Sequence, residues 1–223
     1  MPSDQHPEIK WTNGVPIAAR FDDPYFSLKD GLEESRHVFL EGNALRSRFR
    51  PGFRIAELGF GTGLNCIAAW TLWQECGCIG NLNFTAFERF PMSADDRERA
   101  LAAFPDIADP ASALVAALAN GATKALLPGL ELEVVVGDAR KELPDWSGIA
   151  DAWFLDGFSP AKNPELWEPE LLAEVARHTA LDGTVATYSA AGAVRRGLAK
   201  AGFEVERRSG FGAKRHMTVA RLI

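Results

Sequence analysis

A glycine-rich segment, residues 57–63, combines an acidic side chain with three glycines at alternate positions (Glu-Leu-Gly-Phe-Gly-Thr-Gly). It overlaps the end of the largely apolar run 53–58, which predicts a buried strand. Glycines after a strand permit a tight turn and let a ligand approach the backbone. Their spacing, G-x-G-x-G, differs from the G-x-G-x-x-G that seats a pyrophosphate in dinucleotide-dependent dehydrogenases.

The acidic residue of this segment indicates the kind of ligand. A carboxylate two positions ahead of the first glycine can pair with an ammonium group, which S-adenosylmethionine has and NAD lacks. The segment therefore predicts a site for S-adenosylmethionine. Phe60 is expected to lie against the cofactor because it interrupts the glycines. The expected cofactor-binding residues of the segment are Glu57, Gly59, Phe60, Gly61 and Gly63.

Acidic residues also stand at the ends of the next two predicted strands. Glu88 is placed where a carboxylate accepts hydrogen bonds from ribose hydroxyls. Asp138, followed by Ala139, is placed where it can accept a hydrogen bond from the adenine amino group. Plainer interpretations stay open, because Glu88 could pair with Arg89 at the surface and Asp138 could cap the next helix. We expect Glu88, Asp138 and Ala139 to belong to the cofactor site.

Residues 156–160, Asp-Gly-Phe-Ser-Pro, follow the predicted strand 150–155. They are similar to the Asp/Asn-Pro-Pro-aromatic motif of amine-directed methyltransferases, whose polar side chain holds the target nitrogen. A primary alkylamine has a pKa of about 10.4, so exposing its lone pair at pH 7 costs roughly 4–5 kcal/mol. A carboxylate beside the amine can orient it and accept its proton. We therefore expect Asp156 to be catalytic and to border the cofactor, and Phe158 either to pack on the acceptor as a second catalytic residue or to lie in the core.

The composition is that of a globular protein, since 47% of the 223 residues are hydrophobic and 24% are charged. No apolar run reaches the ~18 residues of a membrane span, and the first residues do not resemble a secretory signal, so a cytoplasmic protein is expected. The three cysteines have no histidine or further cysteine close by, which favours free thiols over a metal site.

Charge is unevenly distributed along the chain. The net charge is −6, yet residues 195–223 contain eight Lys and Arg against two Glu, a net charge of +6. Such asymmetry is expected of a face that meets a polyanion, and equally of a solvated helix and strand edge.

Strand and helix patterns alternate from residue 53 onward, which predicts a parallel sheet covered by helices. The short connection 207–216 suits an antiparallel final pair of strands. The expected fold class is a Rossmann-like α/β methyltransferase with a mostly parallel seven-stranded sheet and an antiparallel last strand. Strands are expected at 53–58, 84–87, 132–136, 150–155, 183–188, 203–206 and 217–222, and helices at 63–76, 93–120 with breaks at its prolines, from Asn163-Pro164 onward, and at 193–201.

Residues 1–50 are expected to form an N-terminal extension that packs on the core, and residues 51–223 the adenosylmethionine-binding domain. Within the extension, Asn13-Gly14 between apolar flanks predicts a hairpin. A loop is expected at 21–26 and an interrupted helix at 32–49. Three polar residues of the extension are candidates for closing over the cofactor: Glu33, Glu34 and Asn43.

The segment 153–167 (Trp-Phe-Leu-Asp-Gly-Phe-Ser-Pro-Ala-Lys-Asn-Pro-Glu-Leu-Trp) resembles the MnmC methyltransferase family. The resemblance extends over nearly the whole chain, through segments 21–27, 31–36, 38–43, 57–65, 87–88, 193–198, 201–203 and 210–215. It implies that 5-aminomethyl-2-thiouridine at the wobble position of certain tRNAs is methylated to 5-methylaminomethyl-2-thiouridine.

Two-domain members of that family also carry a C-terminal FAD-dependent oxidoreductase, which makes the aminomethyl precursor. Because this chain stops after the last predicted strand, we expect it to bind no FAD and to be either a stand-alone methyltransferase or part of a longer protein. An oxidoreductase acting on the same nucleoside is then the expected partner. The resemblance also implies contacts with the tRNA backbone, for which the candidates are Lys162, Arg195, Arg196, Lys214 and Arg215.

Three other interpretations stay open at this point. A spermidine-synthase-like aminopropyltransferase shares the sheet, the glycine loop and a catalytic Asp after the fourth strand, but it would use decarboxylated adenosylmethionine. A methyltransferase acting on a small-molecule amine is the second. The third is a tRNA-binding scaffold with a decayed cofactor site, against which the intact acidic residues argue: Glu57, Glu88, Asp138 and Asp156.

Overall fold

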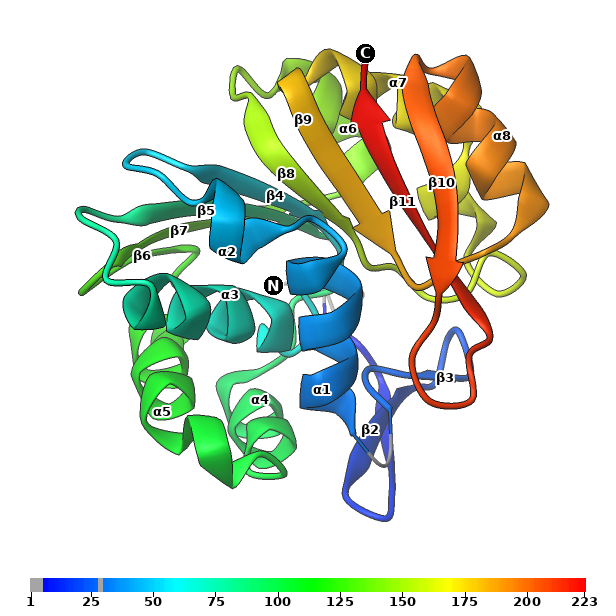
Figure 1. The fold of residues 1–223 in the computed structure, drawn as a ribbon. Coiled ribbons are helices and arrows are strands. Elements are labelled where there is room, and N and C mark those ends of the chain that lie inside the picture. The colour runs from blue at the N-terminus through cyan, green and yellow to red at the C-terminus, as the bar shows by residue number, and fades with distance from the viewer. Residues whose placement is uncertain (1–5, 28–29) are drawn as a thin grey trace.

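The computed structural model describes residues 6–27 and 30–223 of the protein. At its centre is an eight-stranded sheet with the order β10-β11-β9-β8-β4-β5-β7-β6 (Figure 1). Its strands are β4 (Arg54–Leu58), β5 (Leu82–Glu88), β6 (Lys124–Leu127), β7 (Leu130–Val136), β8 (Ala150–Leu155), β9 (Thr179–Thr187), β10 (Phe203–Ser209) and β11 (His216–Leu222). β4, β5, β7, β8 and β9 are parallel, whereas β11 is antiparallel to both of its neighbours. The predicted fold class, a mostly parallel α/β sheet with an antiparallel last strand, is confirmed.

The sheet contains one strand more than the seven expected, and the additional strand is β6. It pairs antiparallel with β7 at the edge of the sheet. Of its four residues only Ala125 is buried, while Leu126 is 74% exposed. A short edge strand with a single buried side chain lacks the apolar alternation by which strands are recognised in a sequence.

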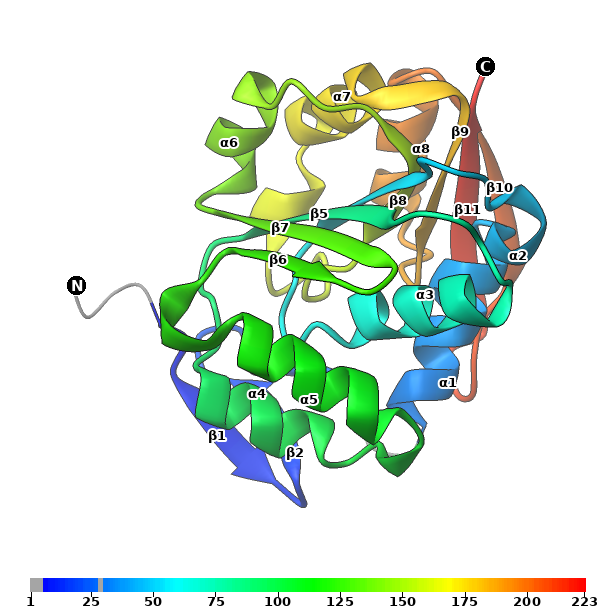
Figure 2. The same cartoon turned by 90° about the vertical axis from the view of Figure 1, so that its left-hand side faces the viewer.

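Helices cover both faces of the sheet (Figure 2). On one face lie α3 (Leu64–Glu75), α4 (Ala94–Leu101) and α5 (Ala108–Ala117), and on the other lie α6 (Ala139–Asp145), α7 (Pro169–Arg177) and α8 (Gly192–Lys200). Because successive side chains of a strand point to opposite faces, the central strand β8 serves both layers. Phe154 packs in the core cluster with α3 and α5, and Trp153 packs in the cluster with α6, α7 and α8.

The predicted helical stretch 93–120 is divided in the structure. Pro105 opens the 3-10 turn η2 (Pro105–Ile107), whereas Pro110 is accommodated in the first turn of α5, where no hydrogen-bond donor is needed. A further 3-10 turn, η3 (Ala119–Gly121), ends the stretch. Within residues 6–27 and 30–223 no single helix is long and apolar enough to cross a membrane, and the pair formed by α4 and η2–α5 reaches that length only across a bend of 120°.

The helix expected from Asn163 onward also differs in detail. Pro164 opens only the 3-10 turn η4 (Pro164–Trp167), and α7 begins at Pro169. The Asn163 side chain makes no capping hydrogen bond. A second proline five residues after the first therefore sets the start of the longer helix.

A small antiparallel sheet precedes this core and consists of β1 (Ile9–Thr12), β2 (Val15–Ala18) and β3 (Asp23–Pro24). The predicted hairpin is confirmed, because Asn13 and Gly14 connect β1 and β2 with φ angles of 50° and 82°. The small sheet lies at the carboxyl ends of the parallel strands (Figure 1). Its contacts with the core include Arg99 of α4, whose guanidinium lies 3.9 Å from the centre of the Trp11 ring, and the Ser159 backbone N, which donates to Asp23 Oδ2 at 2.9 Å.

The helical stretch expected at 32–49 is broken into three pieces: α1 (Gly31–Ser35), the π-helical η1 (Arg36–Glu41) and α2 (Leu45–Arg48). Between the last two, Ala44 adopts a left-handed conformation with φ 52°. Val38, Phe39 and Leu45 are buried in the same core cluster as α3 and β8. These helices therefore pack directly on the sheet.

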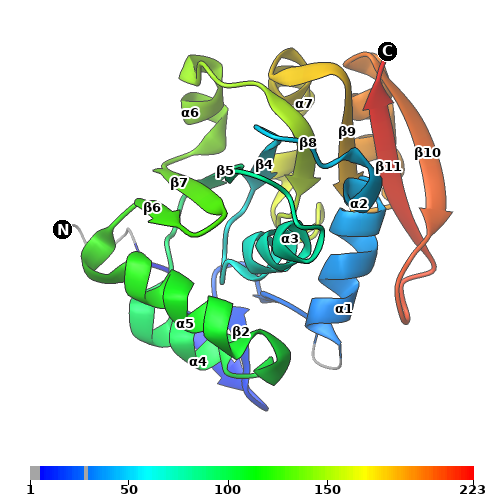
Figure 3. The ribbon, with the colours of Figure 1, turned by 60° about the vertical axis from the view of Figure 1, so that its left-hand side comes forward.

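The chain leaves β4 and β8 in opposite directions across the sheet. β4 is followed by β5 on one side and β8 is followed by β9 on the other, although β4 and β8 are themselves neighbours (Figure 3). In open α/β sheets a crevice for ligands forms at such a switch point, beyond the carboxyl ends of the strands. The segments that follow β4 and β8 are the two that carry the predicted chemistry.

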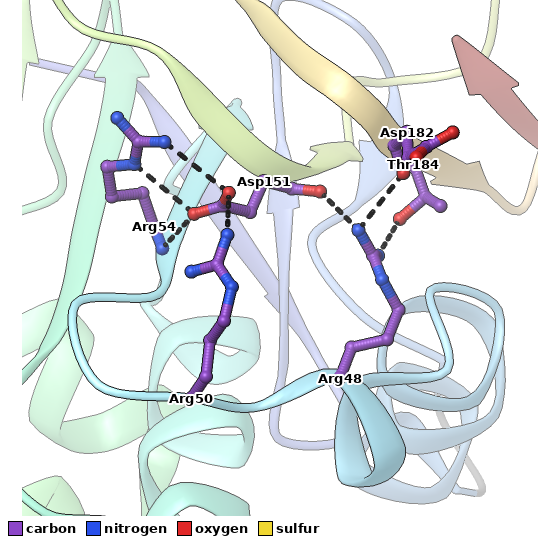
Figure 4. Close-up of polar contacts among 6 residues, drawn as sticks. All are labelled: Arg48, Arg50, Arg54, Asp151, Asp182 and Thr184. Carbon is purple, nitrogen blue, oxygen red and sulfur yellow. Dashed lines mark hydrogen bonds and ion pairs between the residues drawn. The ribbon is translucent and has the colours of Figure 1, made fainter. Parts of the chain in front are cut away.

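Arginine side chains tie the opposite end of the sheet to the preceding helices (Figure 4). Arg48 donates hydrogen bonds to the Asp151 carbonyl oxygen, at 2.8 Å, and to Thr184 Oγ1. The Asp151 carboxylate is only 3% exposed and accepts from Arg50 Nη2 at 2.8 Å and from the Arg54 backbone N at 2.9 Å. Burial alone would raise the pKa of this carboxyl, but the hydrogen bonds and charges of the two arginines outweigh it and lower the pKa.

We expect Asp151→Asn to lower the free energy of unfolding by about 2 kcal/mol at pH 7, because two hydrogen-bonded charges lose their buried partner. Since the folded-state pKa is lowered, this contribution is present above the pKa of the unfolded chain and is lost as the pH falls through the folded value. Urea denaturation at pH 7 and pH 3 measures both effects. The exposed Arg46–Glu75 pair is the control, and Glu75→Gln should change stability by less than about 0.5 kcal/mol. Equal losses for the two variants would contradict this role of Asp151.

Candidate active site

A cavity of about 970 Å³ lies at the carboxyl ends of β4, β5, β7 and β8. The loops after these strands line one side, and the small sheet together with the loop 210–215 between β10 and β11 lines the other. Its volume suits a ligand larger than a nucleoside. Of the residues predicted from the sequence, ten line the cavity: Glu34, Gly59, Phe60, Gly61, Glu88, Asp138, Ala139, Asp156, Phe158 and Lys214.

The glycine loop is held against the end of β8. A Cβ atom added to Gly59 would lie 2.0 Å from the Asp156 carbonyl oxygen, and its φ of +88° is in the left-handed region. Only glycine allows this approach. The Asp156 backbone N in turn donates to the Leu58 carbonyl at 3.1 Å. Glycine at position 59 therefore determines how closely the two chemistry-bearing segments meet.

Behind this contact, one amide joins two carboxylates. Asn65, in the first turn of α3, donates from Nδ2 to Glu57 Oε1 at 2.8 Å and to Asp156 Oδ2 at 2.6 Å. Its Oδ1 accepts from the Ser35 hydroxyl at 2.5 Å. Glu57 has no exposed surface, and its Oε2 has no hydrogen-bond partner within the described residues. Glu57 therefore lies just beneath the cavity wall, and Asp156 lies on it.

Burial changes the protonation of both carboxyls. It raises the pKa of Glu57 well above the ordinary value, and the charge of Asp156 adds to this effect while the hydrogen bond from Asn65 opposes it. Burial likewise raises the pKa of Asp156 to about 7, against the hydrogen bond from Asn65 and the charge of Lys214. A carboxyl that titrates near neutral pH in a cavity is a candidate for proton transfer.

The two other acidic candidates occupy the far part of the cavity. Glu88 accepts hydrogen bonds from the Gly61 backbone N at 2.9 Å and the Phe90 backbone N at 2.7 Å, so its carboxylate is oriented by the glycine loop. It does not pair with Arg89, which contacts Asp138 at 3.1 Å instead. Asp138 caps α6 by accepting from the Arg140 backbone N, and it also lines the cavity. The capping interpretation is thus confirmed without removing Asp138 from the site.

An aromatic cluster stands beside Asp156. The ring of Phe158 stacks on Phe21 at 4.7 Å and meets Tyr25 edge-on at 5.2 Å, both from the segment around β3. Phe158 is only half-buried and faces the cavity, so it lies in the site and not in the core. Phe60, by contrast, is 3% exposed and packs under the guanidinium of Arg97.

The predicted basic residues separate into two groups. Lys214 Nζ pairs with Glu34 Oε1 at 2.6 Å and lies 4.3 Å from the centre of the Tyr188 ring, inside the cavity wall. Lys162 Nζ pairs with Asp23 at 3.2 Å and does not line the cavity. The remaining three lie on α8 or before β11, away from the cavity: Arg195, Arg196 and Arg215. Glu57 and Gly63, predicted as cofactor-binding, lie beneath the lining residues.

Several residues of the site were not predicted. Asn65 and Ser35 are both buried, and the signal for Asn65 was a polar residue among the apolar residues that open α3. Tyr25 and Tyr188 line the cavity, and burial raises the pKa of both phenols. Of the extension's polar candidates only Glu34 lines the cavity, whereas Glu33 pairs with Arg36 and Asn43 is bound to backbone and to Thr184. Within the described residues, no group of three or more His, Cys, Asp or Glu is placed to hold a metal ion.

A mostly parallel sheet with an antiparallel β11, a glycine loop after β4 and acidic side chains at the switch point define a Rossmann-like methyltransferase. Residues 106–223 match the family described as S-adenosyl-L-methionine-dependent methyltransferase, and the chain belongs to that family. Its cofactor is therefore S-adenosylmethionine.

Similar proteins support the resemblance to MnmC that the sequence predicted. The chain is 46% identical to the tRNA 5-methylaminomethyl-2-thiouridine biosynthesis bifunctional protein MnmC of Hahella chejuensis, over 98% of this chain and 37% of that protein. For the protein of the same name from Chromobacterium violaceum, the identity is 43% over 96% of this chain and 34% of the relative. The chain thus spans about a third of the length of these curated relatives.

A solved structure gives the same result for the fold. The crystal structure of MNMC2 from Aquifex aeolicus superposes with a TM-score of 0.80 at 29% sequence identity. The match covers 99% of this chain and 72% of the Aquifex chain. The N-terminal elements are thus included in the match together with the sheet.

We expect Asp156→Asn to stabilise the protein, and to do so more at pH 8 than at pH 5. Because the folded-state pKa of Asp156 is raised to about 7, stability is highest below the unfolded-state pKa and is lost as the pH rises through about 7. Asparagine stays neutral, so its advantage should grow by about 2 kcal/mol between the two pH values. Urea denaturation measures the difference.

Asp138→Asn is the matched control for this titration. The hydrogen bond from Arg140 lowers the pKa of Asp138, so its replacement should reduce stability at pH 8 and bring no gain. An Asp156→Asn advantage that is the same at both pH values would show that Asp156 does not titrate in this range.

Proposed function

We propose that this chain transfers a methyl group from S-adenosylmethionine to the exocyclic amine of 5-aminomethyl-2-thiouridine at the tRNA wobble position, giving 5-methylaminomethyl-2-thiouridine. One observation carries the proposal: the Asp156 carboxylate stands on the cavity wall at the end of β8, joined through Asn65 to Glu57. The acceptor nucleoside is taken from the similar proteins, which are named for tRNA 5-methylaminomethyl-2-thiouridine biosynthesis.

The residues present fit S-adenosylmethionine. Glu57 Oε2 is a buried acceptor that lacks a partner within the described residues, which suits an ammonium group bound directly or through a water. Each oxygen of Glu88 accepts one backbone N–H and retains a lone pair for a ribose hydroxyl. Asp138 and the backbone of Ala139 line the cavity and would receive the adenine, and Gly59, Phe60, Gly61 and Gly63 would shape the loop against the cofactor.

When bound, S-adenosylmethionine supplies an electrophilic methyl group. Asp156 would hold the acceptor amine by a hydrogen bond and take up its proton. The pKa gap between an alkylamine and an ordinary Asp is about 6.5 units, roughly 9 kcal/mol. With the pKa of Asp156 raised to about 7, the gap falls to about half. The buried environment therefore makes Asp156 a better proton acceptor than an exposed carboxylate.

The aromatic cluster would receive the base. Phe158 presents a half-buried ring beside Asp156, and its stacking partner Phe21 lies in the turn between β2 and β3 of the small sheet. An aromatic ring beside the group that holds the reacting amine can fix the plane of a pyrimidine by stacking. We assign Phe158 to the catalytic site on this ground.

Phosphates of the tRNA would meet basic residues around and beyond the cavity. Arg196 and Arg215 are exposed and are the clearest candidates, with Arg195 beside them. Lys162 and Lys214 already have carboxylate partners, which a phosphate would have to displace. Because the longer relatives are named as bifunctional, we also propose an FAD-dependent oxidoreductase, as a domain or a separate protein, as the source of the acceptor. With a tRNA substrate, we propose that the activity is cytoplasmic.

The direct test incubates the protein with labelled S-adenosylmethionine and tRNA that lacks the final methyl group, followed by nucleoside analysis. We expect label in 5-methylaminomethyl-2-thiouridine. Asp156→Ala should lower kcat by more than about 100-fold, within the range for loss of a proton acceptor, and change cofactor affinity less than about threefold. The exposed Asp106→Ala is the control and should match the wild type. Aminopropyl transfer from decarboxylated adenosylmethionine, or failure to bind S-adenosylmethionine, would contradict the proposal.

The double charge reversal Arg196→Glu with Arg215→Glu should weaken tRNA binding about tenfold at 0.1 M salt, because two cationic contacts become repulsive. The slope of log Kd against log salt concentration should fall by about two. Binding assays over a salt series measure both. Cofactor affinity should be unchanged, as should tRNA affinity in the control Arg46→Glu, which lies on α2. Unchanged tRNA affinity in the double variant would show that these basic residues are structural.

A further inference from the structure

Asn65 lies where the cofactor side and the acceptor side of the cavity meet. It is contributed by α3, and its side chain contacts residues of three other segments: Glu57 on β4, Asp156 after β8 and Ser35 at the end of α1. It lines the cavity although it is 7% exposed. Neither the sequence motifs nor the chemistry described above assigns it a role.

Both N–H donors and the oxygen of the Asn65 amide have hydrogen-bond partners, and these partners suit one orientation of the amide. A primary amide has two N–H donors, and Asn65 directs one to each carboxylate, at 2.8 and 2.6 Å. The Ser35 hydroxyl donates to the amide oxygen at 2.5 Å. A flipped amide would point its oxygen at two carboxylates, which can only accept when ionised. The carboxylates therefore determine the orientation of Asn65, and the hydrogen bond from Ser35 holds the amide oxygen in place.

The amide also separates two acidic groups, one on β4 and one just after the neighbouring strand β8. Glu57 is paired in register with Phe154, so Asp156 follows two positions further along the chain. With no donor between them, two carboxylates in a poorly hydrated site repel each other and share a proton. The hydrogen bonds from Asn65 lower the pKa of both. These hydrogen bonds thus favour the ionised form of both carboxyls, so that each can accept a hydrogen bond from its own cationic or proton-bearing ligand.

We propose that Asn65 is a positioning residue that holds Glu57 and Asp156 as one unit, so that the cofactor's amino group and the acceptor amine are received by carboxylates whose separation a single amide determines. The inference rests on the proposed function for the identity of the two ligands. Asn65 itself touches neither reacting atom. It acts through the carboxylates, and Ser35 acts through Asn65.

A shared amide predicts a particular pattern of losses. Asn65→Leu keeps the approximate volume and removes both donors, so it should weaken S-adenosylmethionine binding and methyl transfer together. A hydrogen bond to a charged group corresponds to about tenfold or more in affinity. Because the effect on binding passes through Glu57, it should disappear when Glu57 is already neutral.

The first measurement is calorimetric titration of the purified full chain with S-adenosylmethionine, without tRNA. We expect Asn65→Leu to raise Kd at least tenfold in the wild-type background and less than twofold in the Glu57→Gln background. Thr71→Val is the matched control, because Thr71 lies on the same helix, lines a separate groove and contacts neither carboxylate. Its Kd should equal that of the wild type.

The second measurement is the pH profile of single-turnover methyl transfer. The rate should rise with pH as Asp156 loses its proton, and we call this part of the profile the Asp156 limb. Loss of the Asn65 donors should move the midpoint of this limb to higher pH by about one unit, a shift that a general loss of packing does not produce. Asp156→Asn should remove that limb, and Asn65→Leu should then cause no further shift. Ser35→Ala leaves Asn65 and both carboxylates in place, and it should raise Kd about threefold and shift the limb in the same direction.

Equal losses of affinity from Asn65→Leu in the wild-type and Glu57→Gln backgrounds, or an unshifted pH limb, would overturn the proposal. If Asn65→Leu does not fold, the Ser35→Ala variant decides instead, because a Kd and a pH limb equal to wild type would show that holding the Asn65 amide in place is immaterial to both carboxylates. The titration requires no tRNA, so it tests the role of Asn65 in cofactor binding even if another amine is the acceptor. Failure of the wild type to bind S-adenosylmethionine would instead refute the proposed function itself.

Discussion

The approach of the glycine loop to the end of β8 is the constraint on which the rest of the site depends. At Gly59 there is no room for a side chain, because the Asp156 carbonyl oxygen occupies the place of a Cβ atom. This contact brings the ends of two parallel strands together at the switch point of the sheet. It also explains why two carboxylates can share one amide, since Glu57 and Asp156 reach Asn65 from either side.

From this contact follow both the electrostatics and the shape of the cavity. The small sheet and the loop 210–215 cover the strand ends where the acidic pair lies. The loop 210–215 brings Lys214 to the cavity wall, where it pairs with Glu34 of α1 and partly offsets the negative charge around Asp156. The cover and the sheet therefore act together, and neither forms the site alone.

Much of this could be predicted from the sequence, where local chemistry and periodicity agree. The strands flanking the glycine loop, the antiparallel end of the sheet and the placement of Asp156 follow from spacing and from apolar patterns. Strand β6 could not be predicted in this way, because Ala125 is its only buried residue. Asn65 and Ser35 could not be either, since their roles arise from contacts between residues 30 and 91 positions apart. Lys214 was expected to meet phosphate, but the sequence does not show that Glu34 lies within 2.6 Å.

The strand order β10-β11-β9 has a consequence for translation. β11 is the last of these strands to be synthesised, yet it lies between two strands that leave the ribosome earlier. In the described sheet β10 is hydrogen-bonded to β11 alone, so it has no ladder to join while residues 216–222 are still in the exit tunnel. The connecting loop, and with it Lys214, can dock against Glu34 only after that strand has inserted. Co-translational folding of this domain therefore leaves the wall of the cavity open until nearly all of its residues have emerged.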